Sequence, residues 1–221
     1  MKRGKHRQST WWTGNIRTVD VGKRLRLVPY WEAAAVREDR LNIVIDPGPS
    51  FGSGDHPSTV MALELLEIAM ERHGPGTAPP SVLDVGTGTG VLAIAARVLG
   101  AGDVVGLDID SSAVFTARRN LELNGPTIRR SGGDDAIPFF VGTTRAAGGV
   151  FDVVIANLAA PTLIRLFEDL TELTGSDLIL SGIADAMEAT VLETYGSGGL
   201  DLLRHIKKEG WNAFLFTRPK K

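Results

Sequence analysis

Residues 81–99 read SVLDVGTGTGVLAIAARVL, the clearest strand-loop-helix pattern in the chain. A short apolar strand is followed by three alternating glycines and then by an apolar helix that Gly100 ends. Alternation of strand and helix continues downstream, with strands predicted at residues 103–107, 127–131, 151–156 and 177–181. This alternation is typical of a parallel sheet with helices on both faces. Residues 200–206 and 211–216 then predict an antiparallel hairpin at one side of the sheet.

The chain ahead of this stretch predicts further elements. Residues 16–20 and 24–28 flank a glycine turn and predict a β-hairpin, and residues 41–45 form another strand. Pro57 suits the first position of a helix that we expect to run to about residue 72.

Charge is distributed unevenly along the chain. Residues 1–40 carry ten Lys or Arg and four Asp or Glu, whereas the whole chain has a formal net charge of −2. A basic arm on an acidic body could contact an acidic partner such as RNA, or it could be a solvated tail. We therefore predict a basic N-terminal extension with a short β-hairpin, residues 1–45, followed by the main α/β domain, residues 46–221.

The composition excludes several classes of protein. Cysteine is absent, which rules out a disulfide scaffold, a thiolate zinc site, an iron–sulfur cluster and a cysteine nucleophile. The four histidines are scattered without metal-ligand spacing, so no metal site is expected. No run approaches the roughly 18 apolar residues of a membrane span, so we expect no membrane partner and a cytoplasmic location. The sequence does not indicate the oligomeric state.

The residues that follow each strand form the candidate site, because ligands of such sheets bind outside the carboxyl ends of the strands. Gly86, Gly88 and Gly90 let a ligand approach the backbone closely, and Asp84 precedes them. The dinucleotide fingerprint G-x-G-x-x-G would need a glycine where the chain has Val91. The spacing instead resembles the D-x-G-x-G-x-G loop of S-adenosylmethionine-dependent methyltransferases. A merely tight strand-to-helix turn is the alternative.

Acidic residues and an asparagine follow the next strands. A carboxylate at Asp108 can accept both hydrogen bonds of a ribose diol, and Asp110 is expected at a helix start. Asp134 or Asp135 falls where an adenine amino group would lie, with surface solvation as the alternative. Asn157 follows an apolar strand, where its carbonyl could accept a hydrogen bond from a substrate amine. An ordinary turn-forming asparagine is the alternative at that position.

A resemblance to one family rests on several motifs in a fixed order. Residues 46–59, DPGPSFGSGDHPST, closely resemble the signature D-P-G-x-x-F-G-T-G-x-H-x-T-T of the ribosomal protein L11 methyltransferases. The glycine loop and three later motifs fall in the family's order: Asp108-Ile109-Asp110, Asn157-Leu158-Ala159 and Lys208-Glu209-Gly210-Trp211. The resemblance covers roughly residues 19 to 218.

The resemblance implies a Rossmann-like class I methyltransferase fold, an α/β fold with a mostly parallel seven-stranded sheet. Residues 46–221 would form the catalytic domain, with S-adenosyl-L-methionine as cofactor. Thr59 would bind the cofactor carboxylate through its hydroxyl and the free amides of the first helical turn, whereas His56 is explained as a helix cap. The predicted catalytic residue is Asn157, and the predicted cofactor-binding residues are Thr59, Asp84, Gly86, Gly88, Gly90, Asp108 and Asn157.

The resulting hypothesis is a protein N-methyltransferase that acts on lysine or α-amino groups, with ribosomal protein L11 as the candidate substrate. The family has a second small N-terminal domain that holds the ribosomal protein. Only about 18 residues precede the matching segment here, so we expect that domain to be missing. The alternatives are an RNA or small-molecule N-methyltransferase and a non-catalytic cofactor-binding protein.

Overall fold

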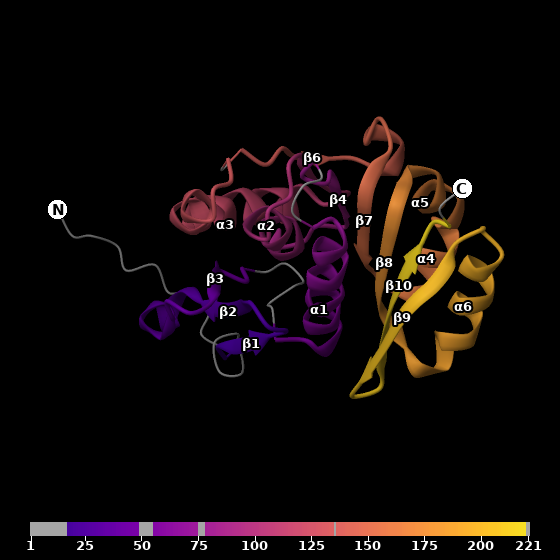
Figure 1. Cartoon of the computed structure of the whole chain (residues 1–221), viewed down its shortest axis with the longest axis horizontal. Helices are drawn as coiled ribbons and strands as arrows, with labels where there is room; N and C mark the ends of the chain where they lie inside the picture. Colours follow the sequence, from indigo (N-terminus) through magenta and orange to yellow (C-terminus); the bar gives the residue numbers. More distant parts are fainter. Residues whose placement is uncertain (1–16, 49–54, 75–77, 135, 220–221) are drawn as a thin grey trace.

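A seven-stranded sheet lies at the centre of the residues that the computed structural model describes: 17–48, 55–74, 78–134 and 136–219. Its strands, in spatial order, are β6 (Phe139–Val141), β5 (Val104–Asp108), β4 (Val82–Val85), β7 (Phe151–Asn157), β8 (Thr174–Ala184), β10 (Trp211–Thr217) and β9 (Asp201–Lys208) (Figure 1). The first five of these strands are parallel, and β10 runs antiparallel to both of its neighbours. The predicted mostly parallel sheet with a C-terminal antiparallel hairpin is therefore confirmed.

The antiparallel direction of β10 brings its first residue to the carboxyl edge of the parallel strands. Trp211 pairs with Ala184, the last residue of β8, and with Lys208 of β9. The turn between β9 and β10 is formed by Glu209 and Gly210, both with positive φ, 51° and 82°. Gly210 tolerates this conformation at no steric cost.

Helices cover both faces of the sheet because successive strand residues point to opposite sides. In β7, Val153 and Ile155 join a core with α1 (Pro57–Arg72), α2 (Val91–Val98) and α3 (Ser111–Arg130). Val154 and Ala156 join the opposite core with α4 (Ala160–Arg165), α5 (Phe167–Leu173) and α6 (Glu188–Gly196). Figure 1 shows these two groups of helices on either side of the strands. Within the described residues, no helix is both long and apolar enough to cross a membrane.

The first strands form a separate three-stranded sheet of β1 (Val19–Val21), β2 (Leu25–Pro29) and β3 (Leu41–Ile45). β1 and β2 make the predicted antiparallel hairpin, and β3 pairs with β2 in parallel after the short helix η1 (Tyr30–Ala35). This sheet buries its apolar face in the same core as α1, α2 and α3. Residues on both sides of position 45 thus share one core, and the division of the chain at that position stays a prediction.

A buried carboxylate fastens the hairpin turn to α1. Glu67, only 4% exposed, accepts hydrogen bonds from the backbone amides of Lys23 (2.8 Å), Arg24 (2.8 Å) and Leu25 (3.1 Å). Gly22 precedes them with φ +52°, and a Cβ at this position would collide with the Glu67 carboxylate. Both backbone shape and close approach therefore require glycine here.

The strand predicted at residues 127–131 is wrong, because α3 continues through Pro126 to Arg130. Ile128 is completely buried against the other helices, and this packing outweighs the β-branched local preference of Thr127 and Ile128. The strand that pairs with β5 is β6, which begins twelve residues after the start of the predicted strand. Two short helices lie between β7 and β8, because Leu166 ends α4 before α5 begins.

Candidate active site

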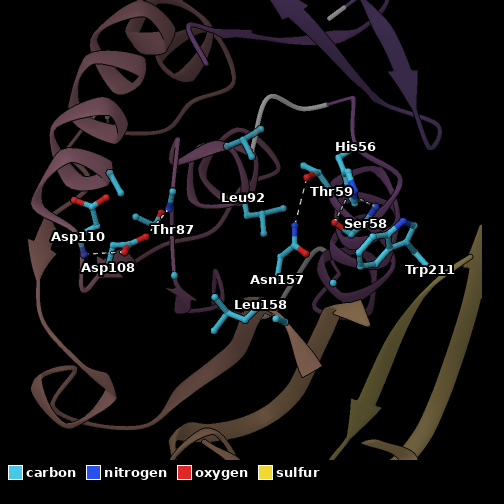
Figure 2. Close-up of a pocket in the computed structure, with 16 residues that line it drawn as sticks. His56, Ser58, Thr59, Thr87, Leu92, Asp108, Asp110, Asn157, Leu158 and Trp211 are labelled. Atoms are coloured by element: carbon cyan, nitrogen blue, oxygen red, sulfur yellow. Dashed lines mark hydrogen bonds between the residues drawn. The ribbon is translucent and has the colours of Figure 1, made fainter. Parts of the chain in front are cut away.

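A cavity of about 470 Å³ lies at the carboxyl ends of the parallel strands. Its walls come from the start of α1, the loop after β4, the ends of β5 and β7, and the start of β10 (Figure 2). The predicted site residues that line it are Thr59, Gly86, Gly88, Asp108 and Asn157. Gly182, which follows the strand predicted at residues 177–181, also lines the cavity, as expected for a residue at the carboxyl end of a strand. Sequence reasoning missed the wall residues Ser58, Leu92 and Leu158. Ser58 and Leu158 each adjoin a predicted residue in the sequence, and this is the only signal that points to them.

The glycine loop follows β4 and depends on backbone conformations that favour glycine. Gly86, Gly88 and Gly90 have φ of 74°, 55° and 80°. The amide of Gly86 donates to the carbonyl of Leu107 (2.9 Å), which fixes the start of the loop on the neighbouring strand. A Cβ at Gly86 would collide with the side chain of Leu158. Gly90 is the N-cap residue of α2 and does not line the cavity, so its direct contact with a cofactor stays a prediction.

Asp108 ends β5 with its carboxylate at the cavity wall. Its Oδ2 accepts from the amide of Gly88 (3.0 Å), and its Oδ1 accepts from the amide of Asp110 (3.0 Å). These bonds hold the carboxylate in place and leave further lone pairs for a ligand, since each carboxylate oxygen can accept two hydrogen bonds. Asp110 caps α3 by accepting from the amide of Ser112 (2.8 Å), which confirms its predicted place at a helix start.

Asp84 lies beneath the glycine loop rather than in the cavity wall. Its side chain is fully buried, and its Oδ2 accepts from the hydroxyl of Thr87 (2.7 Å) and the amide of Ala93 (3.2 Å). Its Oδ1 is buried without a hydrogen-bond partner among the described residues. Burial raises the pKa of this carboxyl from 3.8 to about 7. Asp84 thus supports the loop from below, and a direct contact with a cofactor stays a prediction.

Asn157 ends β7 and contacts Thr59 on α1. Its Nδ2 donates to the Thr59 hydroxyl at 3.3 Å, whereas its Oδ1 is buried with no donor among the described residues. Figure 2 shows the nitrogen turned toward Thr59 and the oxygen on the side of Ser58 and Trp211. A Cβ at Gly182 would lie 3.0 Å from this oxygen, so glycine leaves room beside it. An unpaired buried acceptor costs about 1–3 kcal/mol, which marks a position that a ligand donor can fill.

The first turn of α1 does not offer the free amides that were predicted to bind a carboxylate. The amide of Thr59 donates to the carbonyl of His56 (2.9 Å), and the amide of Ser58 donates to the His56 Nδ1 (3.3 Å). His56 is therefore the helix cap, as predicted. The Thr59 hydroxyl accepts from Asn157 and keeps its own hydrogen as a donor.

An aromatic wall closes the cavity beside Asn157. The ring of His56 meets the ring of Trp211 edge to face, with 4.9 Å between centroids and 71° between planes. The His56 Nδ1 also lies 2.8 Å from the Ser58 hydroxyl. The cap of α1 and the start of β10 thus support each other at the cavity.

A second cavity of about 410 Å³ adjoins the first and shares Gly86, Asp108 and Leu158 with it. Ile109 lies at its edge with 78% exposure, and Gly142 and Thr143 line it after β6. The prediction of an adenine contact by Asp134 is wrong, because Asp134 precedes β6 and lies at the opposite end of this strand from Asp108. Asp135 lies outside the described residues. Gly142 and Thr143 could have been found from the sequence, because an apolar run that can form a strand ends directly before them.

The sequence is similar to proteins of one family. A family model described as "Ribosomal protein L11 methyltransferase" matches residues 7–219. A protein of that name from Geobacter sp. (strain M21) is 43% identical over 211 residues, which cover 94% of this chain and 66% of the relative. The chain belongs to the ribosomal protein L11 methyltransferase family. It spans about two thirds of the length of this relative.

Solved structures share the fold of this family member. The ribosomal protein L11 methylase from Lactobacillus delbrueckii subsp. bulgaricus has a TM-score of 0.76 at 27% identity, covering 92% of this chain and 98% of that chain. Magnesium protoporphyrin IX methyltransferase from Synechocystis PCC 6803, solved with bound SAM, has a TM-score of 0.58 at 19% identity, over 73% of this chain and 82% of that chain. The predicted Rossmann-like class I methyltransferase fold is therefore confirmed.

The positions to which the family resemblance assigns cofactor contacts lie together in this fold. Thr59, Gly86, Asp108 and Asn157 all line the first cavity, although they come from four separate segments. The family signature at residues 46–59 is described only in part, since residues 49–54 lie outside the described ranges. Its last residue, Thr59, is the one that reaches Asn157.

Proposed function

We propose that the chain is an S-adenosylmethionine-dependent N-methyltransferase whose acceptor is an amino group of a protein, with ribosomal protein L11 as the first candidate. One observation carries the proposal. The buried Asn157 oxygen lacks a donor among the described residues, and it borders the same cavity as the glycine loop and the Asp108 carboxylate. The names of the relatives support L11 as substrate.

The residues present fit the cofactor at both of its ends. Asp108 has acceptor capacity for the two ribose hydroxyls while it stays anchored to Gly88. The adjoining cavity, with Ile109 and the backbone around Gly142, offers an apolar slot for the purine ring. The Thr59 hydroxyl retains a hydrogen that can be donated to the cofactor carboxylate. The glycine loop separates these two ends and lets the ligand lie close to the backbone.

Asn157 positions the acceptor amine. When bound, S-adenosylmethionine supplies a sulfonium methyl that an amine lone pair can displace. The Asn157 Oδ1 accepts one N–H of the amine and so directs the lone pair away from itself, toward the cavity. An amide side chain cannot take up the amine proton near neutral pH, so Asn157 orients the amine and the proton leaves to solvent. Orientation of this kind is the main contribution a protein can make to a displacement with a good leaving group.

The protonation state of the amine favours one acceptor over another. An ammonium has no lone pair, so the amine must lose a proton before it attacks. For a lysine with a pKa of about 10.4 this costs about 4.6 kcal/mol at pH 7, and for an α-amine near 7.8 only about 1 kcal/mol. Burial of the amine beside the aromatic wall lowers both costs, because desolvation disfavours the charged form. A terminal α-amine is therefore the acceptor that this site methylates most readily.

The N-terminal sheet offers fewer available cations than its sequence indicates. Arg26 pairs with Asp20 and donates to the carbonyl of Ala35 (2.9 Å), and Arg37 pairs with Asp39 and Asp20. Lys23, 82% exposed, is 3.8 Å from Glu71. Arg26 and Arg37 are therefore engaged within the sheet, and RNA enters the test below as an alternative acceptor.

The test is transfer of labelled methyl groups from S-adenosylmethionine to purified L11, to other basic proteins and to RNA. We expect label in L11, enriched at its α-amine. Label in another protein but not in L11 would keep the reaction and reject the substrate. Label in RNA alone would reject the substrate class. Cofactor binding by calorimetry without any transfer would identify a non-catalytic binding protein.

A further inference from the structure

Asn120 on α3 joins two distant segments of the chain by hydrogen bonds, although it belongs to none of the sequence motifs. Its side chain is fully buried. The Oδ1 accepts from the amide of Asp46 (2.8 Å), and the Nδ2 donates to the carbonyls of Asp46 (3.0 Å) and Thr89 (2.9 Å). Both amide hydrogens of the side chain are therefore used, and they bind two different segments of the chain.

Asn124 lies one turn further along α3 and repeats two of these three hydrogen bonds. It is also fully buried, and its side chain accepts from the amide of Val44 (2.8 Å) and donates to the carbonyl of Val44 (2.7 Å). Its other donation, to the carbonyl of Asn120 (2.7 Å), stays within α3. The two asparagines thus continue the hydrogen-bond ladder along the edge of β3 that β2 leaves open.

The two asparagines differ because only Asn120 forms a hydrogen bond with the glycine loop. Thr89, whose carbonyl Asn120 binds, lies between Gly88, held by Asp108, and Gly90, the N-cap residue of α2. Each of the loop residues 87, 88 and 89 therefore has a separate side-chain anchor, in Asp84, Asp108 and Asn120. Of these anchors, Asn120 is the one that also binds Asp46, the residue directly after β3 of the three-stranded sheet.

We propose that Asn120 is a positioning residue that couples strand β3 to the cofactor-binding loop, so that docking of the N-terminal sheet holds the loop in its binding conformation. This inference rests on the proposed function for the nature of the ligand, although the coupling itself concerns the protein without ligand. A loop with three glycines at positive φ has many alternative conformations, and fixed anchors reduce the entropy that binding would otherwise lose.

The test compares Asn120→Ala with Asn124→Ala, a matched control that removes an equal number of hydrogen bonds from an equally buried asparagine. Hydrogen exchange of the protein without cofactor is the first readout. Both variants should speed exchange in residues 41–46. Only Asn120→Ala should speed exchange in residues 86–93, by about tenfold, as expected for the loss of one buried hydrogen bond.

Calorimetry with S-adenosylmethionine is the second readout. Asn120→Ala should weaken binding by about five- to tenfold, and Asn124→Ala by less than about twofold. Equal effects of the two variants on the loop or on affinity would overturn the coupling. Failure of the wild-type protein to bind the cofactor would reject the proposed function, while the exchange experiment would still test Asn120.

A measurement on the wild-type protein covers the case in which Asn120→Ala does not fold. In native-state hydrogen exchange with rising urea, amides of residues 41–46 and 86–90 should open as one cooperative unit with one free energy. Opening of the two segments with separate free energies would overturn the proposal.

Discussion

Asp84 should make the stability of this fold depend on pH between 5 and 8. Its carboxyl is fully buried, and burial raises its pKa from 3.8 to about 7. Because the folded pKa lies above the unfolded one, the folded state binds the proton more tightly. The stabilisation is fully present below about pH 4 and is lost as the pH rises through about 7. The total effect is about 4 kcal/mol, of which about 2.5 kcal/mol falls between pH 5 and pH 8.

The substitution Asp84→Asn tests this reasoning because the amide keeps the shape of the carboxyl and cannot ionise. Urea denaturation at pH 5 and pH 8 gives the free energy of unfolding of both proteins. Relative to wild type, the variant should gain about 2.5 kcal/mol between pH 5 and pH 8. Asp103→Asn, at an exposed position next to β5, is the control for a neutralised surface carboxylate. If the free energy of unfolding depends on pH in the same way for wild type and Asp84→Asn, the raised pKa of Asp84 is refuted.

Three further substitutions test the cavity and the hydrogen bonds between Glu67 and the hairpin turn. Asp108→Ala should weaken S-adenosylmethionine binding by about 3–6 kcal/mol in calorimetry, because two hydrogen bonds to a charged acceptor are lost; unchanged affinity would reject the ribose contact. Asn157→Ala should reduce the rate of methyl transfer far more than cofactor affinity, and equal losses would make Asn157 a cofactor residue only. Glu67→Ala should lower the free energy of unfolding by about 3–5 kcal/mol in urea, since three amides lose a charged acceptor. Glu71→Ala on the exposed side of α1 is its control. An equal loss of unfolding free energy in both variants would contradict the stabilising role of Glu67.

Most of the fold was predictable because hydrophobic periodicity and turn residues agree along this chain. Pro57 marks the first residue of α1, and the glycines after β4 mark the start of α2. The prediction of a strand at residues 127–131 failed because the local preference of these residues for a strand opposes their packing in the folded protein. Only the buried position of Ile128 in the core decides for helix, and no local pattern reports that.

The site was predictable where one residue acts alone and less so where distant residues combine. Asp108 follows from its place after a strand. The bond between Asn157 and Thr59 joins positions 98 residues apart, so spacing could not reveal it. Asn157 followed from its place after a strand, whereas Thr59 came from the family resemblance. Asp84 was assigned from its motif to the ligand, whereas its burial under Thr87 depends on the three-dimensional path of the loop. Asn120 belongs to no motif that local reasoning could recognise.

The reversed direction of β10 has a consequence for engineering. In a parallel strand, residues at the cavity come last, and the chain must pass through the core before it reaches them. Trp211 instead comes first in β10, directly after the exposed turn at Glu209 and Gly210. The wall of the cavity formed by Trp211 can therefore be rebuilt by changing the length or sequence of one surface turn. The wall formed by the glycine loop, held by the buried anchors Asp84 and Asn120, would stay as it is.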